Sequence, residues 1–202
     1  MKKLKRGLPP TCLQGKLSVR TLSKKAIWLE LNKMQHGFCA YCERKLNDKK
    51  HIEHFVPKRD DKKLEHEWGN LFGSCGNYTQ PWDSCGIFKD EKARPYNFKH
   101  LIKPDVESPD KYLKFSSTGT VKPKPNLNGL DLEKAQETIR VFNLNKCIKL
   151  AGARKSFLKK QLPFVNQLIK EHGFTLEDAM KLINNSESTE FSTALTQLLA
   201  PF

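Results

Sequence analysis

The sequence predicts an α+β fold whose middle is held by a metal ion and whose C-terminal third is helical. Residues 38–100 lack long apolar runs and contain four of the six cysteines, so packing alone is a poor source of stability there. Apolar residues recur at the 3.6-residue period of a helix in one N-terminal segment and again after Asp131. A chain of 202 residues is long enough for one domain with a core, or for two small domains that share one.

The charge of the chain indicates a polyanionic partner such as nucleic acid. Lys and Arg number 36 against 22 Asp and Glu, which leaves a net charge of +14. The alternative is a basic, well-solvated surface without such a partner. No apolar run approaches the roughly 18 residues of a membrane span, and no apolar segment of a signal peptide follows the basic start. We therefore expect a cytoplasmic protein without membrane contact, whose cysteines are reduced thiols or metal ligands.

The N-terminal part divides into an arm and a helix. Residues 1–16 are basic, and the Pro9-Pro10 pair disfavours helix, so we expect an extended arm that lies along a partner or a nucleic acid. Residues 17–100 form the core segment, which begins with a helix over Ser18–Gln35. Gly37 is the stop signal of this helix.

The rest of the core segment and the connector are built from short elements. We expect a strand over His51–Val56, stopped by Pro57, and a helix that opens at Cys85. Residues 101–130 form a connector with one strand pair, in which Thr118-Gly119 is the turn signal.

Residues 131–202 are expected to be helical. The expected helices cover residues 131–144, 147–162, 164–173, 175–185 and 189–199, and Pro163 interrupts the run between the second and the third. Thr175, followed three residues later by Asp178, suits a helix N-terminus. These helices complete the fold or, alternatively, provide a docking surface for a partner.

Four cysteines have the pattern of a structural zinc site. Cys39-x-x-Cys42 forms one edge of a tetrahedral site, because two thiolates on a tight turn both reach the ion. Cys75 and Cys85 form a second pair with an unusually long insert of nine residues. Four thiolates close the coordination sphere, so this zinc would be structural. A redox dithiol at Cys39 and Cys42 is the alternative, but no thioredoxin-like βαβ pattern surrounds it.

A histidine-rich strand lies between the two cysteine pairs. Side chains alternate along a strand, so His54 and Glu53 face opposite sides of it. Taken alone, the histidines of this strand are ordinary surface or core residues. The pieces "CAYC", "EHFVPK", "WGNLFGSC" and "CGIFK" follow in this order over some fifty residues. Together they resemble the HNH, or ββα-metal, endonuclease family.

A narrower resemblance covers most of the chain. The opening "MKKLKRGLPP", then "CAYCER", "HIEHFVPK", "WGNLFGSC" and the later "AQETIRVFNLN" region are similar to PtuB, the nuclease subunit of Septu-type anti-phage defence, and to nucleases found with certain retrons. In that group an ATPase of the ABC/SMC type, PtuA, assembles with the nuclease and controls it. The resemblance therefore implies a hetero-oligomer that acts on DNA.

The resemblance also implies roles for individual residues. His54 would be the general base and Asn70 the residue that braces the loop and orients the base. Glu53 would bind a catalytic divalent ion, Mg²⁺ or Mn²⁺. His51 would ligate the metal, contact phosphate, or do neither. Basic residues near the site would contact the phosphate backbone, namely Lys58, Arg59 and Lys89.

One position departs from the family pattern. The place directly after the last cysteine, where the family has a second metal ligand, is Gly86. Either Asp83 or Asp90 supplies this ligand, or Glu53, water and the DNA phosphate hold the metal weakly. Two other functions stay open: a zinc-stapled nucleic-acid-binding or adaptor module whose nuclease site has decayed, and a free-standing restriction-like nuclease.

Overall fold

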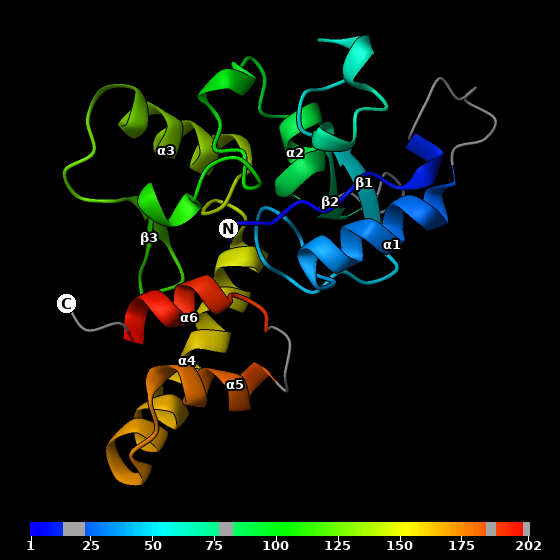
Figure 1. Cartoon of the computed structure of the whole chain (residues 1–202). Coiled ribbons are helices and arrows are strands. Elements are labelled where there is room, and N and C mark those ends of the chain that lie inside the picture. The colour runs from blue at the N-terminus through cyan, green and yellow to red at the C-terminus, as the bar shows by residue number, and fades with distance from the viewer. Residues whose placement is uncertain (14–22, 77–82, 185–188, 200–202) are drawn as a thin grey trace.

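Helices and two small sheets make up the described part of the chain, which confirms the α+β prediction. The structure is a computed structural model that describes residues 1–13, 23–76, 83–184 and 189–199. Its helices are α1 (Lys24–Gln35), α2 (Cys85–Glu91), α3 (Gly129–Val141), α4 (Ile148–His172), α5 (Leu176–Asn184) and α6 (Ser192–Leu199). Its strands are β1 (Lys50–His54), β2 (Leu71–Cys75), β3 (Leu113–Phe115) and β4 (Val121–Pro123). Figure 1 shows their arrangement.

The antiparallel strands β1 and β2 form the centre of the core segment. Gly73 of β2 faces α1, and a Cβ there would lie 2.9 Å from the Trp28 ring. The next residue, Ser74, faces the opposite way and accepts a hydrogen bond from the backbone N–H of Gly86 in α2. Because side chains alternate along a strand, β2 is covered by α1 on one face and by α2 on the other.

Helix α1 begins and ends with recognisable caps. The Ser23 hydroxyl accepts a hydrogen bond from the Ala26 N–H at the start. At the end, His36 and Gly37 both have positive φ, so the chain turns sharply towards the cysteines. The predicted stop at Gly37 is confirmed, whereas residues 18–22 of the predicted helix lie outside the described residues.

The N-terminal residues lie on the chain's own core. Met1 and Leu4 are buried, and the amino group of Met1 lies 2.7 Å from Glu43 Oε1. The Leu4 N–H donates to the Pro104 carbonyl. The Arg6 guanidinium lies over the ring of Trp68, 4.8 Å from its centroid. Residues 1–10 have no helix or strand, and Thr11–Leu13 form a 3₁₀ helix. Residues 14–16 of the expected arm lie outside the described residues, and the described part packs against this chain.

The connector contains the predicted hairpin. Strands β3 and β4 pair in antiparallel register, and Gly119 in the turn has φ of 83°. This conformation favours glycine, and a Cβ there would also lie 2.5 Å from the Ala151 carbonyl of α4. The buried Arg154 of α4 donates to the Gly119 carbonyl at 2.6 Å. The hairpin and the first half of α4 are therefore tied together.

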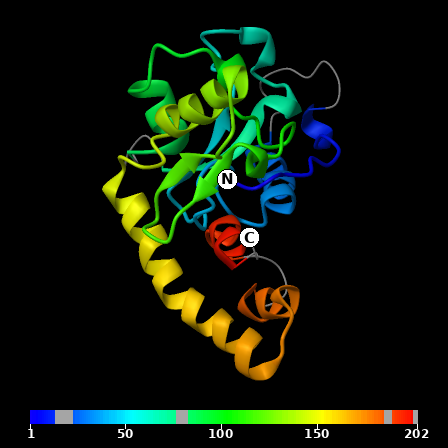
Figure 2. The same ribbon diagram turned by 90° about the vertical axis from the view of Figure 1, so that its left-hand side faces the viewer.

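Helix α4 is continuous, so the predicted interruption at Pro163 is wrong. Pro163 lies inside the helix at an exposed position. The carbonyl that loses its partner belongs to Lys159, whose exposed position leaves this carbonyl accessible to solvent. Leu158 and Val165 are buried on the other face and hold the two halves in one helix. Figure 2 shows that α4 curves without breaking.

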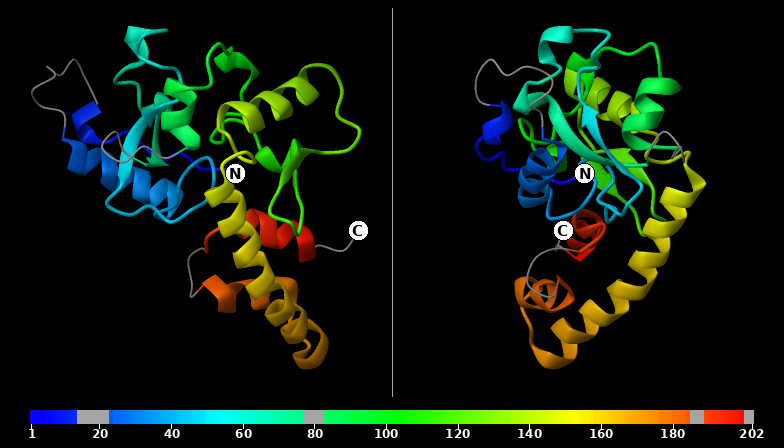
Figure 3. Two further views of the ribbon diagram at one scale, coloured as in Figure 1. Left: turned by 180° about the vertical axis from the view of Figure 1, so that it is seen from behind. Right: turned by 90° about the vertical axis from the view of Figure 1, so that its right-hand side faces the viewer.

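The last two helices pack on α4. Thr175 accepts a hydrogen bond from the Asp178 N–H and donates one to its carboxylate, which confirms the predicted start of α5. Helix α6 contacts both α4 and β3. It lies between the core and α5, which Figure 3 shows from two sides. Among the described residues, every helix is too short or too polar to cross a membrane.

Candidate active site beside a thiol cluster

The four predicted cysteines come together in one place, here called the thiol cluster (Cys39, Cys42, Cys75 and Cys85). Their Sγ atoms all lie within 4.8 Å of one another. The Sγ atoms of Cys42 and Cys75 are 3.7 Å apart, and two thiolates of a tetrahedral zinc are about 3.8 Å apart at a Zn–S distance of about 2.3 Å. The thiol cluster thus has the donor set and spacing to bind a structural metal ion.

Local backbone contacts shape the turn that carries the first two thiols. The Cys39 N–H donates to the Arg44 carbonyl, and the Glu43 N–H donates back to the Cys39 carbonyl. Glu43 has φ of 63°, which reverses the chain directly after Cys42. The Ala40 N–H donates to the Gly73 carbonyl and so fixes the turn on β2.

The thiols cannot all ionise without a cation. Burial opposes ionisation of Cys39, but hydrogen bonds from the other three thiols bring its pKa well below the usual value. Burial and the neighbouring thiols raise the pKa of Cys85 well above the usual value. A thiolate at one cysteine thus opposes ionisation of the next thiol. A bound metal ion would provide the positive charge that four neighbouring thiolates need.

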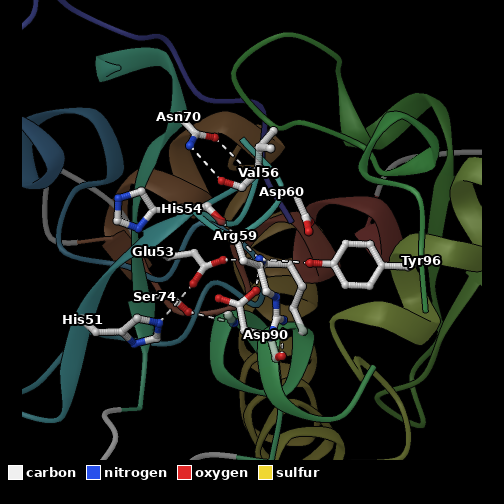
Figure 4. Close-up of polar contacts among 12 residues, drawn as sticks. His51, Glu53, His54, Val56, Arg59, Asp60, Asn70, Ser74, Asp90 and Tyr96 are labelled. Carbon is white, nitrogen blue, oxygen red and sulfur yellow. Dashed lines mark hydrogen bonds and ion pairs between the residues drawn. The ribbon is translucent and has the colours of Figure 1, made fainter. Parts of the chain in front are cut away.

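Strand β1 presents its polar side chains on two faces, as predicted. His51 and Glu53 point to one side, and their ring and carboxylate lie against each other in Figure 4. His54 points to the other side. The strand is held by β2, with His51 opposite Ser74 and Glu53 opposite Phe72.

Glu53 is a buried carboxylate between two nitrogen groups. Its side chain is 2% exposed, Oε1 lies 2.8 Å from Lys89 Nζ, and Oε2 lies 3.3 Å from His51 Nε2. The Lys89 ammonium is a charge partner of Oε1 but is not aligned as a hydrogen-bond donor, and no other described donor reaches this atom. Burial alone would raise the pKa of Glu53, but the charge of Lys89 and the contact with His51 lower it. Glu53 is therefore an ionised carboxylate whose Oε1 faces the Lys89 ammonium.

Lys89 lies inside the protein rather than at a phosphate-facing surface. Its side chain is fully buried, and Nζ lies 2.5 Å from Asp90 Oδ1, 3.1 Å from the His54 carbonyl and 3.3 Å from the Tyr96 hydroxyl. Burial opposes its charged form, but Glu53 and Asp90 raise its pKa above the usual value. The position predicted to contact phosphate instead carries the counter-ion of two carboxylates.

His54 is fixed as a neutral base. Its Nε2 lies 2.9 Å from the Glu65 carbonyl, so Nε2 carries the proton and Nδ1 the lone pair. Burial lowers the pKa of His54, the Glu65 carbonyl opposes this shift, and the charge of Lys58 adds to it. An imidazole in this state accepts a proton at Nδ1.

Asn70 braces the loop that follows β1. Its Oδ1 accepts from the Val56 N–H at 2.8 Å, and its Nδ2 donates to the carbonyls of Val56 and Leu64, each at 3.0 Å. The residue is 4% exposed. Asn70 therefore ties together the two ends of the loop between Val56 and Leu64, which leads to the carbonyl that holds His54.

The other predicted residues lie at the surface around this site. Lys58 pairs with Glu65, and Arg59 donates to the Asp90 carbonyl. Asp83, a candidate metal ligand, is 57% exposed and pairs with Lys92. Tyr96 was missed by the sequence analysis, because no local pattern connects it with a strand more than forty residues earlier.

Gly86 stands at the closest approach of α2 to β1. A Cβ at this position would lie 2.3 Å from Glu53 Oε2 and 2.9 Å from His51 Nε2. The glycine thus lets the carboxylate and the imidazole occupy the space in front of the first turn of α2.

Comparison with known proteins supports the narrower resemblance. Septu protein PtuB of Bacillus thuringiensis is 29% identical to this chain over 150 residues, which is 73% of the chain. The chain is PtuB-like. The matched residues make up 52% of the relative, so this PtuB-like chain spans about half the length of the curated protein that it matches. No protein-family model matches the chain.

Proposed function

We propose that this PtuB-like chain is the nuclease subunit of an anti-phage defence complex, and that it hydrolyses phosphodiester bonds of DNA with a divalent ion. The observation that carries the proposal is the state of His54. Its Nε2 donates to the Glu65 carbonyl at 2.9 Å, so Nδ1 keeps its lone pair. In the sequence of β1, His54 directly follows Glu53, an ionised and buried carboxylate. A general base and a cation ligand are the two groups that hydrolysis of a phosphodiester needs most.

The proposed reaction begins with His54. Nδ1 takes a proton from a water molecule, and the resulting hydroxide attacks the phosphorus while the bond to the leaving oxygen breaks. The leaving oxygen takes its proton from solvent. Asn70 acts as a positioning residue, because it holds the loop whose far end fixes the Glu65 carbonyl against His54.

Glu53 fits the role of a cation ligand. Its Oε1 is buried, ionised and without an aligned donor among the described residues, which is the condition of a ligand oxygen before the cation binds. A Mg²⁺ or Mn²⁺ ion bound there would neutralise charge on the phosphate and the leaving oxygen. For the thiol cluster we propose a structural Zn²⁺, since soft thiolates select it.

The surroundings of the site suit DNA. Lys58 and Arg59 are exposed beside the site, and the chain carries a net charge of +14. We assign the phosphate contacts to these two residues, because basic side chains at the rim of a site hold the backbone without reading sequence.

The defence role and the partner are carried over from the likeness to PtuB. We propose that the chain works in a hetero-oligomer with a PtuA-like ATPase of the ABC/SMC type. The helical residues 131–202 and the basic N-terminal segment are the candidate docking surfaces. Residues 1–13 already pack on the core through Met1 and Leu4, which favours the helices.

A plasmid-cleavage assay tests the proposed activity. Purified chain, alone and with its ATPase partner, is incubated with supercoiled plasmid in Mg²⁺, in Mn²⁺ and in a chelator. We expect nicked or linear plasmid only with a divalent ion. His54→Ala should reduce the rate by at least about 100-fold, which is the usual contribution of a general base.

His172→Ala is the matched control for this assay. His172 is an exposed histidine in the last turn of α4, and its replacement should leave the rate of the chain without its partner unchanged. Equal cleavage by wild type and His54→Ala would refute the mechanism. Binding of DNA without cleavage under all these conditions would favour the decayed, zinc-stapled binding module instead.

A further inference from the structure

One face of α4 carries positive charge without a carboxylate to balance it. Between Cys147 and Glu171 the sequence has no Asp or Glu. Five exposed lysines of this helix are here called the lysine stripe: Lys149, Lys155, Lys159, Lys160 and Lys170. Within the described part of the chain, no carboxylate forms an ion pair with any of them. The positive charge of this face is therefore available to a partner.

Other helices of the chain pair their exposed lysines within the helix. In α1, Lys33 Nζ lies 2.7 Å from Glu30 Oε1. In α5, Lys181 Nζ lies 3.0 Å from Glu177 Oε1. Each partner is about one helical turn away, where opposite charges stabilise a helix. Helix α4 is the longest of the described helices, yet the lysine stripe has no such pair.

The lysine stripe works against the stability of its own helix. Lys155 and Lys159 are four residues apart, so their like charges repel each other. Lys149 lies in the first turn of α4, where the helix dipole favours acidic residues, and this turn contains none. Residues that break such local rules without a gain in packing are expected at functional positions. The lysine stripe thus has no role in folding that would explain it.

The lysine stripe faces away from the rest of the chain. The buried residues of α4 are Leu150, Arg154, Leu158 and Val165. At about 100° per residue, the five lysines fall within an arc of about 140° on the opposite side of the helix. Figures 2 and 3 show α4 along the edge of the molecule. From Lys149 to Lys170 the stripe extends over about 32 Å, at about 1.5 Å per residue.

The residues between these lysines suit a phosphate backbone. Those within the same arc are small or polar, namely Gly152, Ser156, Pro163, Asn166 and Gln167. Phe164 is the one exposed large apolar side chain between Lys149 and Lys170, a span that is described throughout, and it lies outside the arc. Protein interfaces are depleted in lysine and centre on large apolar anchors, whereas lysines and small polar side chains are usual contacts of phosphates. The length of the stripe also matches one turn of B-DNA, about 34 Å.

We propose that the lysine stripe binds the phosphate backbone of duplex DNA, as a second contact besides the rim of the active site. The proposal rests on the proposed function, because it concerns the same DNA substrate. Helix α4 leads away from the core that carries His54, as Figure 1 shows, so the stripe holds duplex beyond the cleaved bond. Lysines on phosphates read no sequence, so the stripe raises the affinity for duplex of any sequence. The other helical surfaces of residues 131–202 are left for the ATPase.

Fluorescence anisotropy with a labelled duplex of about 30 base pairs, roughly three helical turns, tests the contact. The zinc-loaded full chain is titrated at several KCl concentrations, without added Mg²⁺ or Mn²⁺ so that the DNA stays uncut. The test variant combines Lys155→Gln, Lys159→Gln and Lys160→Gln, because Gln is a good helix former. We expect the Kd to rise by at least about tenfold and the slope of log K against log salt to fall by about 3, close to one per lost phosphate contact.

A triple variant of α1 with the same change of charge is the matched control. It combines Lys24→Gln, Lys25→Gln and Lys33→Gln, all at exposed positions. This control should keep the wild-type Kd and salt slope. Equal losses in the two triple variants would overturn the proposal, because binding would then follow net charge alone. Unchanged binding by the α4 variant would overturn it too, and loss of the ATPase from that variant would then assign the stripe to an acidic protein surface.

Single substitutions keep the test valid if the triple variant of α4 fails to fold. Lys149→Gln and Lys170→Gln lie at the two ends of the lysine stripe, and each should lower the salt slope by about one. Urea unfolding should be unchanged in both, because exposed positions contribute little to stability. A wild-type salt slope in both folded single variants would overturn the proposal.

The outcomes are separable from those of the proposed function. Plasmid cleavage by the α4 triple variant with wild-type Kd would leave the nuclease intact and remove the lysine stripe. Duplex binding that depends on the stripe, without cleavage by the wild type, would support the stripe and count against the nuclease. If both proposals hold, the α4 variant should raise KM for plasmid and leave kcat near the wild-type value, because the stripe contacts no reacting atom.

Discussion

The core around the thiol cluster and the α4–α5 helix pair are stabilised in different ways. In the core, polar and charged groups are buried and face one another, among them Glu53, Asn70 and Lys89. In the helix pair, Leu158, Val165 and Ala179 are buried, while Phe164 is 48% exposed. The core therefore depends on specific charge contacts and on the thiol cluster, and the helix pair on repeated apolar packing.

This difference shows where the molecule tolerates change. A buried ion pair is costly to break, because the remaining charge has no partner. An exposed position on a helix contributes little, because water takes the place of whatever is removed. We therefore expect effects on folding to be large in the core and small on the outer face of the helix pair.

Metal removal should have the largest effect. The thiol cluster joins the turn at Cys39, the end of β2 and the start of α2, so a strong chelator should open all three. Hydrogen exchange should show lost protection in residues 38–76 and 83–91 and a smaller change in α4 and α5. Readdition of Zn²⁺ should restore the protection. Unchanged exchange in the core after complete removal of the metal would contradict a structural role.

Lys89→Met should have the next largest effect. The substitution leaves the buried Glu53 and the half-buried Asp90 without their counter-ion, and loss of one partner of a buried pair costs about 3–5 kcal/mol. Urea unfolding measures the loss. Added Mn²⁺ should recover part of it, because a divalent ion at Glu53 replaces the missing charge. A variant as stable as the wild type would show that the ammonium is not the counter-ion.

Gly86→Ala should have a moderate effect. The new Cβ displaces the Glu53 carboxylate and the His51 ring, and overpacking of this kind costs about 1–3 kcal/mol. Thermal unfolding and Mn²⁺ affinity should fall together. Gly152→Ala is the matched control, because a Cβ there meets nothing within 4 Å. Equal behaviour of the two variants would contradict the close approach at Gly86.

Phe164→Ser should have the smallest effect. The side chain is exposed on α4, so the free energy of unfolding should change by no more than about 0.5 kcal/mol. Urea unfolding is again the measurement. A loss comparable to that of Lys89→Met would show that the helix pair is as sensitive as the core, and would remove the contrast between them.

The sequence predicted the elements better than their contacts. Two cysteine pairs in a segment with few apolar residues predicted the thiol cluster. Thr175 and Asp178 predicted the capped start of α5. The opposite faces of Glu53 and His54 followed from the alternation of a strand. These features depend on neighbours in the chain, which a sequence displays.

Contacts across long separations were harder to predict. Lys89 looks like a surface lysine of a short helix, and its partner Glu53 is 36 residues away. Gly86 looks like the loss of a ligand until the close approach of Glu53 and His51 is known. Pro163 looks like a helix break, yet packing of the apolar face on both sides of it keeps α4 continuous. Tertiary contacts override the local signal in all three cases.

The central claim is that one small core holds two metal ions with different purposes, one in the thiol cluster and one beside β1. Anomalous difference maps, recorded at the zinc and manganese absorption edges from crystals grown with both metals, test it most directly. The account predicts a zinc peak among the four Sγ atoms and a separate manganese peak against the Glu53 carboxylate. Manganese in the thiol cluster, or none beside Glu53, would contradict it.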